Sequence, residues 1–230
     1  MLCYSTLFAQ LKESWKGYLQ LNDSTPLPVQ FIVATHDGQT ALEFQNGSEH
    51  IRTEEAIKSG DSLVFKMPVF DSELHLKLTS SQIKGNWINH ARQDHNIIAF
   101  TAQKASAATA VKTPCRLLHN EHWKVRFSPN GADEYPAIGL FQLDESNGTL
   151  QGTFLTETGD YRFLSGTAKP SDHGYALTFG CFDGSHAFLF KALLDTASKS
   201  MQGTFYSGAD RKSTRLNSSH IPLSRMPSSA

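Results

Sequence analysis

Short apolar runs alternate with turn residues along almost the whole chain. Residues 73–78, Glu-Leu-His-Leu-Lys-Leu, alternate polar and apolar side chains without a break, so Leu74, Leu76 and Leu78 fall on one face of a strand. Residues 123–127, Trp-Lys-Val-Arg-Phe, repeat the pattern. A period of two residues is typical of strands that bury one face, and it predicts a β protein.

The same signals divide the chain into a series of strands. The predicted strands cover residues 15–21, 29–34, 41–44, 61–67, 73–78, 83–88, 96–102, 123–127, 136–143, 149–156, 161–168, 175–182, 187–193 and 200–206. Asn46-Gly47 and Asn147-Gly148 are hairpin-turn dipeptides, and residues 51–57 fit either a helical turn or an edge strand. Strands about 10 to 14 residues apart predict an all-β antiparallel meander with little helix, closed as a barrel or a strongly coiled, calycin-like sandwich.

Residues 104–113 are small and polar and contain four alanines, which is typical of a connection rather than a strand. This segment lies at the midpoint of the chain. We interpret residues 11–209 as an all-β domain with a connection at this point.

A five-residue motif occurs three times, at residues 83–87, 150–154 and 201–205. Its form is apolar, polar, glycine, polar, aromatic. The glycine is expected where a strand bends or packs closely on another backbone, and the aromatic side chain is expected to point inward. Regular copies suit a barrel whose strands each need the same kink, so we assign the motif a structural role.

The chain begins with an apolar, small-residue segment over residues 1–10. This segment resembles the end of a secretory leader and its cleavage site, with Ala9 as the last residue removed, although no basic region precedes it. A lipoprotein signal that uses Cys3 is an alternative. We therefore expect an exported protein, periplasmic or membrane-attached, with residues 1–10 as a signal-peptide remnant.

Residues 210–230 do not follow the strand pattern. Residues 210–220 are what a widely used short-read sequencing adapter encodes in frame, and residues 224–230 are what its continuation encodes, with a short index between them. We interpret residues 210–230 as an artefactual, disordered tail. The gene's own coding is then expected to stop at about Ala209, and any domain that followed it is missing.

Composition limits the class of partner. The formal net charge is −1, and it becomes −4 without residues 210–230 because 17 basic and 21 acidic residues remain. A mildly acidic chain argues against a nucleic-acid or anionic-membrane partner. The chain contains 39% hydrophobic residues and 15 phenylalanines, which suffice for a packed core, and it contains no apolar run long enough to span a membrane.

Few side chains offer chemistry. His119 and His122 stand three residues apart, but their surroundings favour a surface turn over a metal site. Glu157, Asp160 and Asp183 lie near turns, and two of them facing each other across a cleft would form a hydrolase acid/base pair. Nothing in the spacing places them opposite one another, so we predict no catalytic, cofactor-binding or metal site.

The cysteines are Cys3, Cys115 and Cys181, and no two of them form a C-x-x-C pair. This spacing offers neither a zinc ribbon nor a redox dithiol. A Cys115–Cys181 disulfide is open, because sequence does not show proximity. Glycosylation sequons occur at Asn22, Asn46 and Asn147, all at predicted turns.

Five segments of the sequence resemble those of a known family. They cover residues 15–19, 61–74, 152–164, 181–190 and 203–208. Together they resemble the N-terminal region of exported bacterial TlpA-like thiol-disulfide oxidoreductases, which carry an extra domain before a thioredoxin-like redoxin domain. The resemblance implies a redoxin domain in cis after Ala209, whose catalytic cysteines have no matching position here. The fragment itself is therefore expected to lack disulfide-exchange activity.

Three functions remain open from the sequence. The first is a non-catalytic accessory domain that positions a protein substrate or partner for the lost redoxin domain. The second is a free-standing, calycin-like barrel that holds a small apolar ligand. The third is a hydrolase that uses Glu157 or Asp160 with Asp183. A cavity open at one end of the barrel favours the second function, and a solidly packed barrel favours the first.

Overall fold

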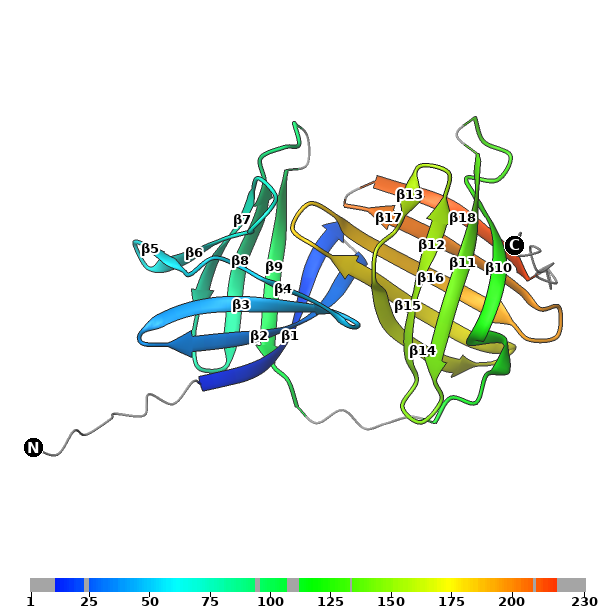
Figure 1. The fold of residues 1–230 in the computed structure, drawn as a ribbon, viewed down its shortest axis with the longest axis horizontal. Coiled ribbons are helices and arrows are strands. Elements are labelled where there is room, and N and C mark those ends of the chain that lie inside the picture. The colour runs from blue at the N-terminus through cyan, green and yellow to red at the C-terminus, as the bar shows by residue number, and fades with distance from the viewer. Residues whose placement is uncertain are drawn as a thin grey trace, which may run out of the picture.

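The computed structural model describes residues 11–22, 25–93, 96–106, 112–132, 134–208 and 210–218, without the side chains of residues 11, 120, 121 and 210–218. It contains two nine-stranded antiparallel sheets, and the one helical element within these residues is the 3-10 helix η1 (Arg116–Leu118). The prediction of an all-β, strongly coiled fold is confirmed (Figure 1). Across the described residues, no helix is long and apolar enough to cross a membrane.

The first sheet has the strand order β4-β3-β2-β1-β9-β8-β7-β6-β5. Its strands are β1 (Leu11–Asn22), β2 (Thr25–His36), β3 (Gln39–Asn46), β4 (Glu49–Arg52), β5 (Ile57–Ser59), β6 (Ser62–Lys66), β7 (Ser72–Leu78), β8 (Gln82–Asn89) and β9 (Ile97–Lys104). Residues 53–56 bridge its two ends, because Thr53 N–H donates to Leu42 and Glu54 N–H donates to Lys66. The ambiguous segment 51–57 is therefore neither a helical turn nor one strand, but a link that draws the sheet nearly closed.

The second sheet closes on itself. Its strands are β10 (His119–Phe127), β11 (Tyr135–Asp144), β12 (Thr149–Thr156), β13 (Gly159–Asp160), β14 (Leu164–Ser171), β15 (Gly174–Phe182), β16 (Ala187–Asp195), β17 (Ser200–Ser207) and β18 (Asp210–Ser218). The order is β11-β10-β18-β17-β16-β15-β14-β12-β13, and an added β11–β12 pairing completes a barrel. The connection predicted over residues 104–113 falls between the two sheets, and residues 107–111 lie outside the described residues.

The expectation of a disordered tail is wrong for residues 210–218. They form β18, which pairs with β17 on one side and with β10 on the other. Unpaired N–H and C=O groups at two facing strand edges accept an extended segment through its backbone, whatever its side chains. Residues 219–230 lie outside the described residues.

The second barrel is filled with aromatic side chains. Phe190 stacks on Phe205 with ring centroids 4.5 Å apart, and it meets Phe154 at 4.6 Å. The void beside these rings has a volume of about 10 Å³, which is too small for a ligand. The barrel interior around these rings is therefore a packed core.

The two sheets interlock through one hairpin. Strands β15 and β16, joined by residues 183–186, turn their outer face toward the opening of the first sheet, and we call them the interlocking hairpin (Figure 1). Phe182 from this hairpin belongs to the first core, where its ring lies 4.8 Å from Phe44 and 5.2 Å from Trp87. Leu189 and Tyr206 complete the same core from β16 and β17. The first core therefore needs residues of the second sheet.

The strand predicted over residues 161–168 starts later than expected. Strand β14 begins at Leu164, and residues 161–163, which we call the strap, lie outside it. Arg162 has a φ of 55°, in the left-handed region, so the alternation is broken there. The strap borders both cavities described below.

The structural role of the repeated motif is confirmed. A Cβ atom at Gly85, Gly152 or Gly203 would collide with a carbonyl oxygen of the neighbouring strand. The aromatic residues two positions later, Trp87, Phe154 and Phe205, are all buried. The glycine is needed because two backbones approach closely there.

Gly152→Ala is expected to lower the free energy of unfolding by about 2–3 kcal/mol, because the added methyl group meets the Leu140 carbonyl and the Phe141 ring. Urea denaturation followed by far-UV circular dichroism measures the change. The neighbouring Thr153→Ala, which adds no atom, is the control and should cost at most about 1 kcal/mol. Equal losses in the two variants would contradict a steric role for Gly152.

Candidate functional site

A cavity of about 500 Å³ opens at the end of the second barrel where the interlocking hairpin turns. We call it the mouth pocket. Its lining comes from the start of β11, the turn between β12 and β13, the strap and the start of β16. The lining residues are Tyr135, Pro136, Thr156, Glu157, Thr158, Gly159, Asp160, Tyr161, Arg162, His186 and Phe188. A cavity of this size suits a small organic molecule.

Two tyrosines form the floor of the mouth pocket. The rings of Tyr135 and Tyr161 stack on Phe127, with centroids 4.8 Å and 5.5 Å away. Their hydroxyl groups are 2.5 Å apart and share a hydrogen bond. Tyr161 is fixed in place because its backbone N–H donates to the Phe154 carbonyl at 3.0 Å. Burial raises the pKa of both phenols, so both are neutral at physiological pH.

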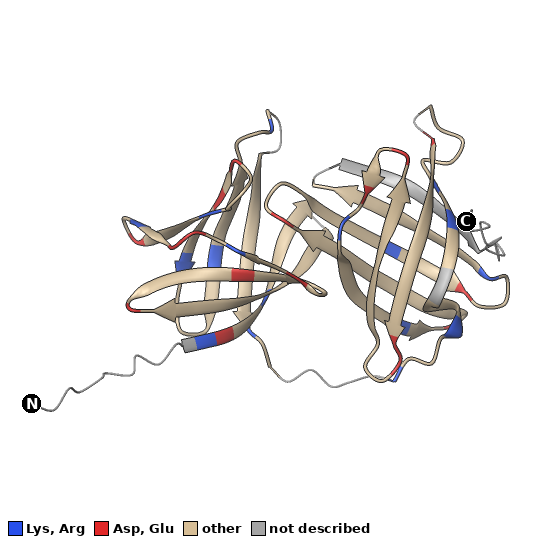
Figure 2. Ribbon diagram, viewed as in Figure 1, with Lys and Arg blue, Asp and Glu red and all other residues tan. Residues whose placement is uncertain are grey.

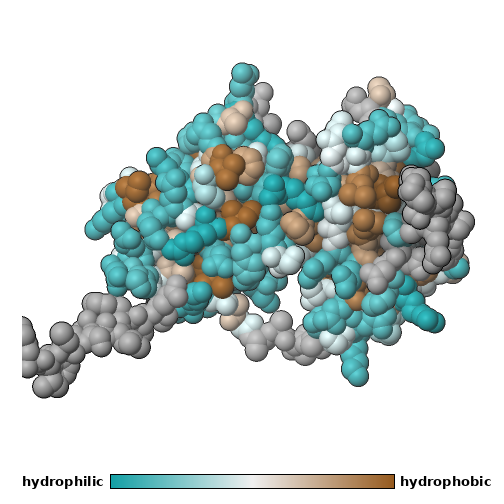
Figure 3. Space-filling view, viewed as in Figure 1, coloured by the Kyte–Doolittle hydropathy of each residue, from teal (hydrophilic) through white to brown (hydrophobic). Residues whose placement is uncertain are grey.

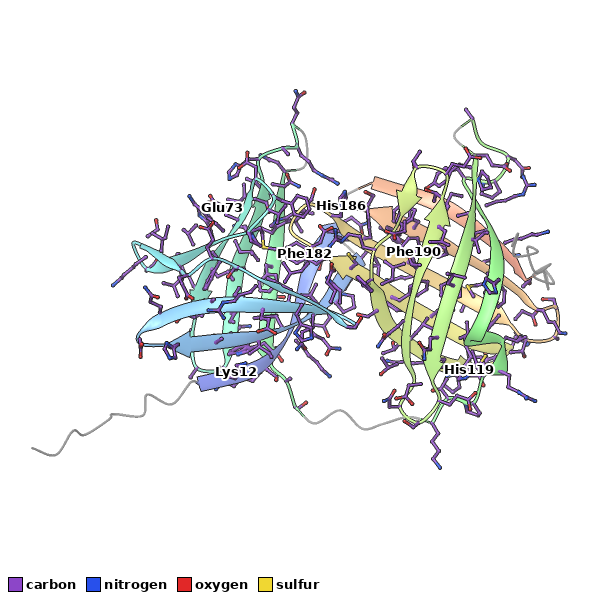
Figure 4. The ribbon with its side chains drawn as sticks, viewed as in Figure 1. Lys12, Glu73, His119, Phe182, His186 and Phe190 are labelled. Atoms are coloured by element: carbon purple, nitrogen blue, oxygen red, sulfur yellow. The ribbon has the colours of Figure 1, made fainter. Side chains whose placement is uncertain are left out.

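One wall is aromatic as well. Phe188 on β16 lies 5.2 Å from Tyr161, and His186 lies 4.8 Å from Phe188, both measured between ring centroids. Figure 4 shows His186 at the junction of the two sheets. The pocket thus combines flat apolar surfaces with a hydroxyl pair at its base.

A buried carboxylate holds this wall together. Asp183 is 1% exposed, and its Oδ1 accepts the backbone N–H groups of Ser185 at 2.8 Å and His186 at 2.7 Å. Its Oδ2 lies 3.1 Å from His186 Nδ1 and 3.3 Å from Arg162 Nε. Burial acts to raise the pKa of Asp183, but the His186 ring and the N–H donors outweigh it, so the pKa lies below its ordinary value.

Arg162 joins the two sheets at this wall. Besides Asp183, its guanidinium pairs with Glu49 at the start of β4 in the first sheet. Nearby, the Asn46 side chain donates to the Phe182 carbonyl at 3.0 Å and accepts from the Phe182 N–H at 3.1 Å. Asn46 is therefore a buried anchor between the sheets, and its side-chain amide is covered in the folded chain.

The structure does not bring Asp183 into one cavity with Glu157 and Asp160, the other two carboxylates proposed for a hydrolase. Glu157 and Asp160 both line the mouth pocket, but Asp183 lies behind Arg162 and His186 and does not line it. The pKa of Asp183 is lowered and both of its oxygens are engaged, which favours a structural role for Asp183 over a role as a general acid.

The remaining sequence candidates also lie away from the mouth pocket. A β-bulge between His119 and His122 places them opposite Gln142 and Leu140, whose side chains face outward from the barrel. No group of three metal-binding side chains occurs among the described residues. Cys115 and Cys181 are both free and buried, so no disulfide joins them, and burial raises the pKa of each thiol. Cys3 lies outside the described residues.

The sequence pointed to Glu157 and Asp160 of the pocket lining, but not to its aromatic residues or to His186. Tyr135 comes from β11, Tyr161 from the strap, and His186 and Phe188 from around the start of β16, so their convergence depends on barrel closure. One local signal was available, since Gly159 and Asp160 break the pattern directly before the strand predicted over residues 161–168. Such a break marks a place where backbone leaves the sheet.

Comparison with known proteins gives weak likenesses. No family model matches the chain, and no curated protein matches it. One similar structure is that of a candidate outer membrane protein from Bacteroides fragilis NCTC 9343. Its sequence is 10% identical to this chain, the TM-score is 0.31, and the match covers 92% of this chain and 97% of that one. A DUF3598-family protein of unknown function from Nostoc punctiforme PCC 73102 is 11% identical, with a TM-score of 0.26, over 91% and 94%. At these values neither likeness assigns a function.

The interpretation as the accessory region of a TlpA-like redoxin enzyme is wrong. No family model matches the chain, and this includes every redoxin model. Parts of three of the five segments that carried the resemblance have a structural explanation. Gly152 and Gly203 lie where a neighbouring carbonyl leaves no room for a Cβ atom, and Asp183-Gly184 belongs to the turn of the interlocking hairpin.

Proposed function

We propose that the chain is a small-ligand-binding module that takes a flat, largely apolar, uncharged molecule into the mouth pocket of the second barrel. The observation that carries this proposal is the floor made by Tyr135 and Tyr161, where stacked rings and a neutral hydroxyl pair lie at the base of a 500 Å³ cavity. Flat aromatic walls favour a planar ligand, and a hydroxyl pair orients one polar group of it.

The charges at the rim support an uncharged ligand. Arg162, the arginine of the pocket lining, already pairs with Glu49 and Asp183, and the His186 ring faces Asp183. Glu157 and Asp160 add negative charge at the entrance. An anionic ligand would therefore meet repulsion without a free cation to offset it. The apolar residues 1–10, which lie outside the described residues, keep export as a prediction.

Titration with the neutral probe N-phenyl-1-naphthylamine, followed by its fluorescence, tests this proposal. We expect saturable enhancement, and an affinity about tenfold weaker in Phe188→Ala, which loses one aromatic wall. Tyr161→Phe should weaken binding less, because it removes one hydroxyl and keeps the ring.

The matched control is Tyr175→Phe, whose hydroxyl donates to the Pro114 carbonyl at 2.5 Å outside the mouth pocket. This variant should bind the probe like the wild type. Absence of saturable enhancement, or equal affinity in the wild type and in a folded Phe188→Ala variant, would overturn the proposed site.

A further inference from the structure

A second cavity, of about 620 Å³, lies between the two sheets. We call it the groove. One side is the turn between β3 and β4, with Asn46, Gly47 and Ser48, and the other is the outer face of the second barrel with the strap and Leu164. Figure 1 shows this turn reaching toward β12 and β14. The groove and the mouth pocket are separate cavities that share Asp160 and Arg162.

The floor of the groove consists of side chains in register on neighbouring strands. His122, Leu140 and Thr153 stand opposite one another on β10, β11 and β12, and Gln142 stands opposite Gln151 in the next row. Directly opposite residues have Cβ atoms about 4.5–5.5 Å apart, so the two amides lie side by side. Thr153 Oγ1 is buried and has no hydrogen-bond partner among the described residues. The floor thus offers paired amides and an unsatisfied hydroxyl.

The groove also carries an exposed aromatic ring. Phe163 of the strap is 53% exposed although it is large and apolar. Along the same outer face, Ile138 and Leu155 are exposed as a cross-strand pair. Figure 3 shows hydrophobic surface over the region of β11 and β12. An exposed ring beside paired amides suits a ligand with one apolar and several polar faces.

The turn between β3 and β4 approaches the floor closely. A Cβ atom at Gly47 would lie 3.3 Å from the Gln151 side chain, so glycine lets the turn sit against the amide. The Asn46 amide already bonds to Phe182, which leaves Ser48 as the polar side chain that the turn presents. A ligand in the groove therefore contacts both sheets.

The described lining of the groove includes one guanidinium, Arg162, and one carboxylate, Asp160. Arg162 already pairs with Glu49 and Asp183, and Asp160 accepts the backbone N–H of Arg162 at 3.1 Å. Figure 2 shows charges of both signs scattered over this face, without a patch of one sign at the junction of the sheets. Amides both donate and accept hydrogen bonds, as alcohol groups do, and they carry no charge. The chemistry that matches them is a set of neighbouring hydroxyl groups.

We propose that the groove binds a neutral saccharide, with its hydroxyl groups on Gln142 and Gln151 and the C–H face of a sugar ring on Phe163. This site is independent of the ligand proposed for the mouth pocket. Because the groove is lined by both sheets, the bound saccharide also ties β3 and β4 to the barrel.

Isothermal titration calorimetry with maltotriose, cellotriose and N,N′,N″-triacetylchitotriose, taken into the millimolar range, tests the proposal. We expect at least one of the three to bind, and its affinity to fall at least tenfold in Gln151→Ala and in Phe163→Ala. The matched control is Gln202→Ala, the same position of the repeated motif on β17, outside the groove, which should bind like the wild type.

Binding of none of the three trisaccharides overturns the proposal, and so does equal affinity in the wild type and Gln151→Ala. The fluorescent probe of the mouth pocket serves as the folding control, because Gln151 does not line that pocket. Probe binding without saccharide binding rejects the groove alone, and saccharide binding without probe binding rejects the mouth pocket alone.

Discussion

Asp183→Ala is expected to lower the free energy of unfolding by about 3–5 kcal/mol, since removing one partner of a buried ion pair leaves the others unsatisfied. Two backbone N–H groups and the His186 ring lose their acceptor, and Arg162 keeps only Glu49. Urea denaturation at neutral pH measures the loss. Probe binding at the mouth pocket should also weaken, because His186 and Arg162 line it.

The control for this prediction is Asp195→Ala. Asp195 caps the turn between β16 and β17 in the same way, with Oδ1 accepting the N–H groups of Ala197 at 2.8 Å and Ser198 at 3.2 Å, but it is only half-buried. Asp195→Ala should lower the free energy of unfolding much less than Asp183→Ala, because water can accept the two N–H groups once the carboxylate is removed. Equal losses of unfolding free energy in the two variants would show that the burial of Asp183 does not increase its contribution to stability.

The contribution of Asp183 also depends on pH. Its pKa in the folded protein lies below its ordinary value, so the stabilisation is fully present above the unfolded-state pKa of about 3.9. It is lost as the pH falls through the folded-state pKa, when the carboxylate takes up a proton. The stability difference between wild type and Asp183→Ala should therefore narrow as the pH falls below about 3.9. A difference that widens on acidification would contradict this assignment.

Phe182→Ala is expected to cost about 3–5 kcal/mol and to uncouple the two sheets. The ring fills the opening of the first sheet between Phe44 and Trp87, so its removal leaves a cavity at the contact between the sheets. The measurement is fluorine NMR of 5-fluorotryptophan-labelled protein in urea. Trp15 and Trp87 report the first core, and Trp123 reports the second.

In the wild type the three signals should disappear together. In Phe182→Ala we expect Trp15 and Trp87 to lose their native signals at lower urea concentration than Trp123. The control is Phe190→Ala, which removes a ring of the same size from the second core, away from the contact (Figure 4). That variant should lose comparable stability while the first core does not unfold ahead of the second. Coincident transitions in Phe182→Ala would contradict the interlock.

Much of the fold follows from local sequence patterns. Leu74 and Leu76 are fully buried on one face of β7, as their alternation predicts, and Asn46-Gly47 and Asn147-Gly148 connect adjacent strands. These features depend on a period of two residues and on turn chemistry, which a single segment contains. The close backbone approach at Gly152 was predicted for the same reason, because a repeated motif shows it.

The sites could not be predicted in this way. Tyr135 and Tyr161 come into contact because β11 pairs with β12. Asp183 and Glu49 are 134 positions apart in the sequence, and Arg162 links them by pairing with both. A buried turn aspartate such as Asp183 looks the same in sequence as the half-buried Asp195, since both cap the turn that follows them. Asp183 and Asp195 differ in the register of their strands and in burial, and the local sequence pattern predicts neither.

The interlocking hairpin has a consequence for synthesis on the ribosome. The strands of the first sheet are complete at Lys104, yet its core includes Phe182, Leu189 and Tyr206. A nascent chain that has just passed the midpoint therefore holds an unfinished core with an apolar opening, and folding from the N-terminus cannot proceed one sheet at a time. The first core is completed only when residues as late as Tyr206 have been synthesised. A ribosome that pauses between the two sheets would therefore hold a partly folded chain with exposed apolar surface, which is a substrate for chaperones.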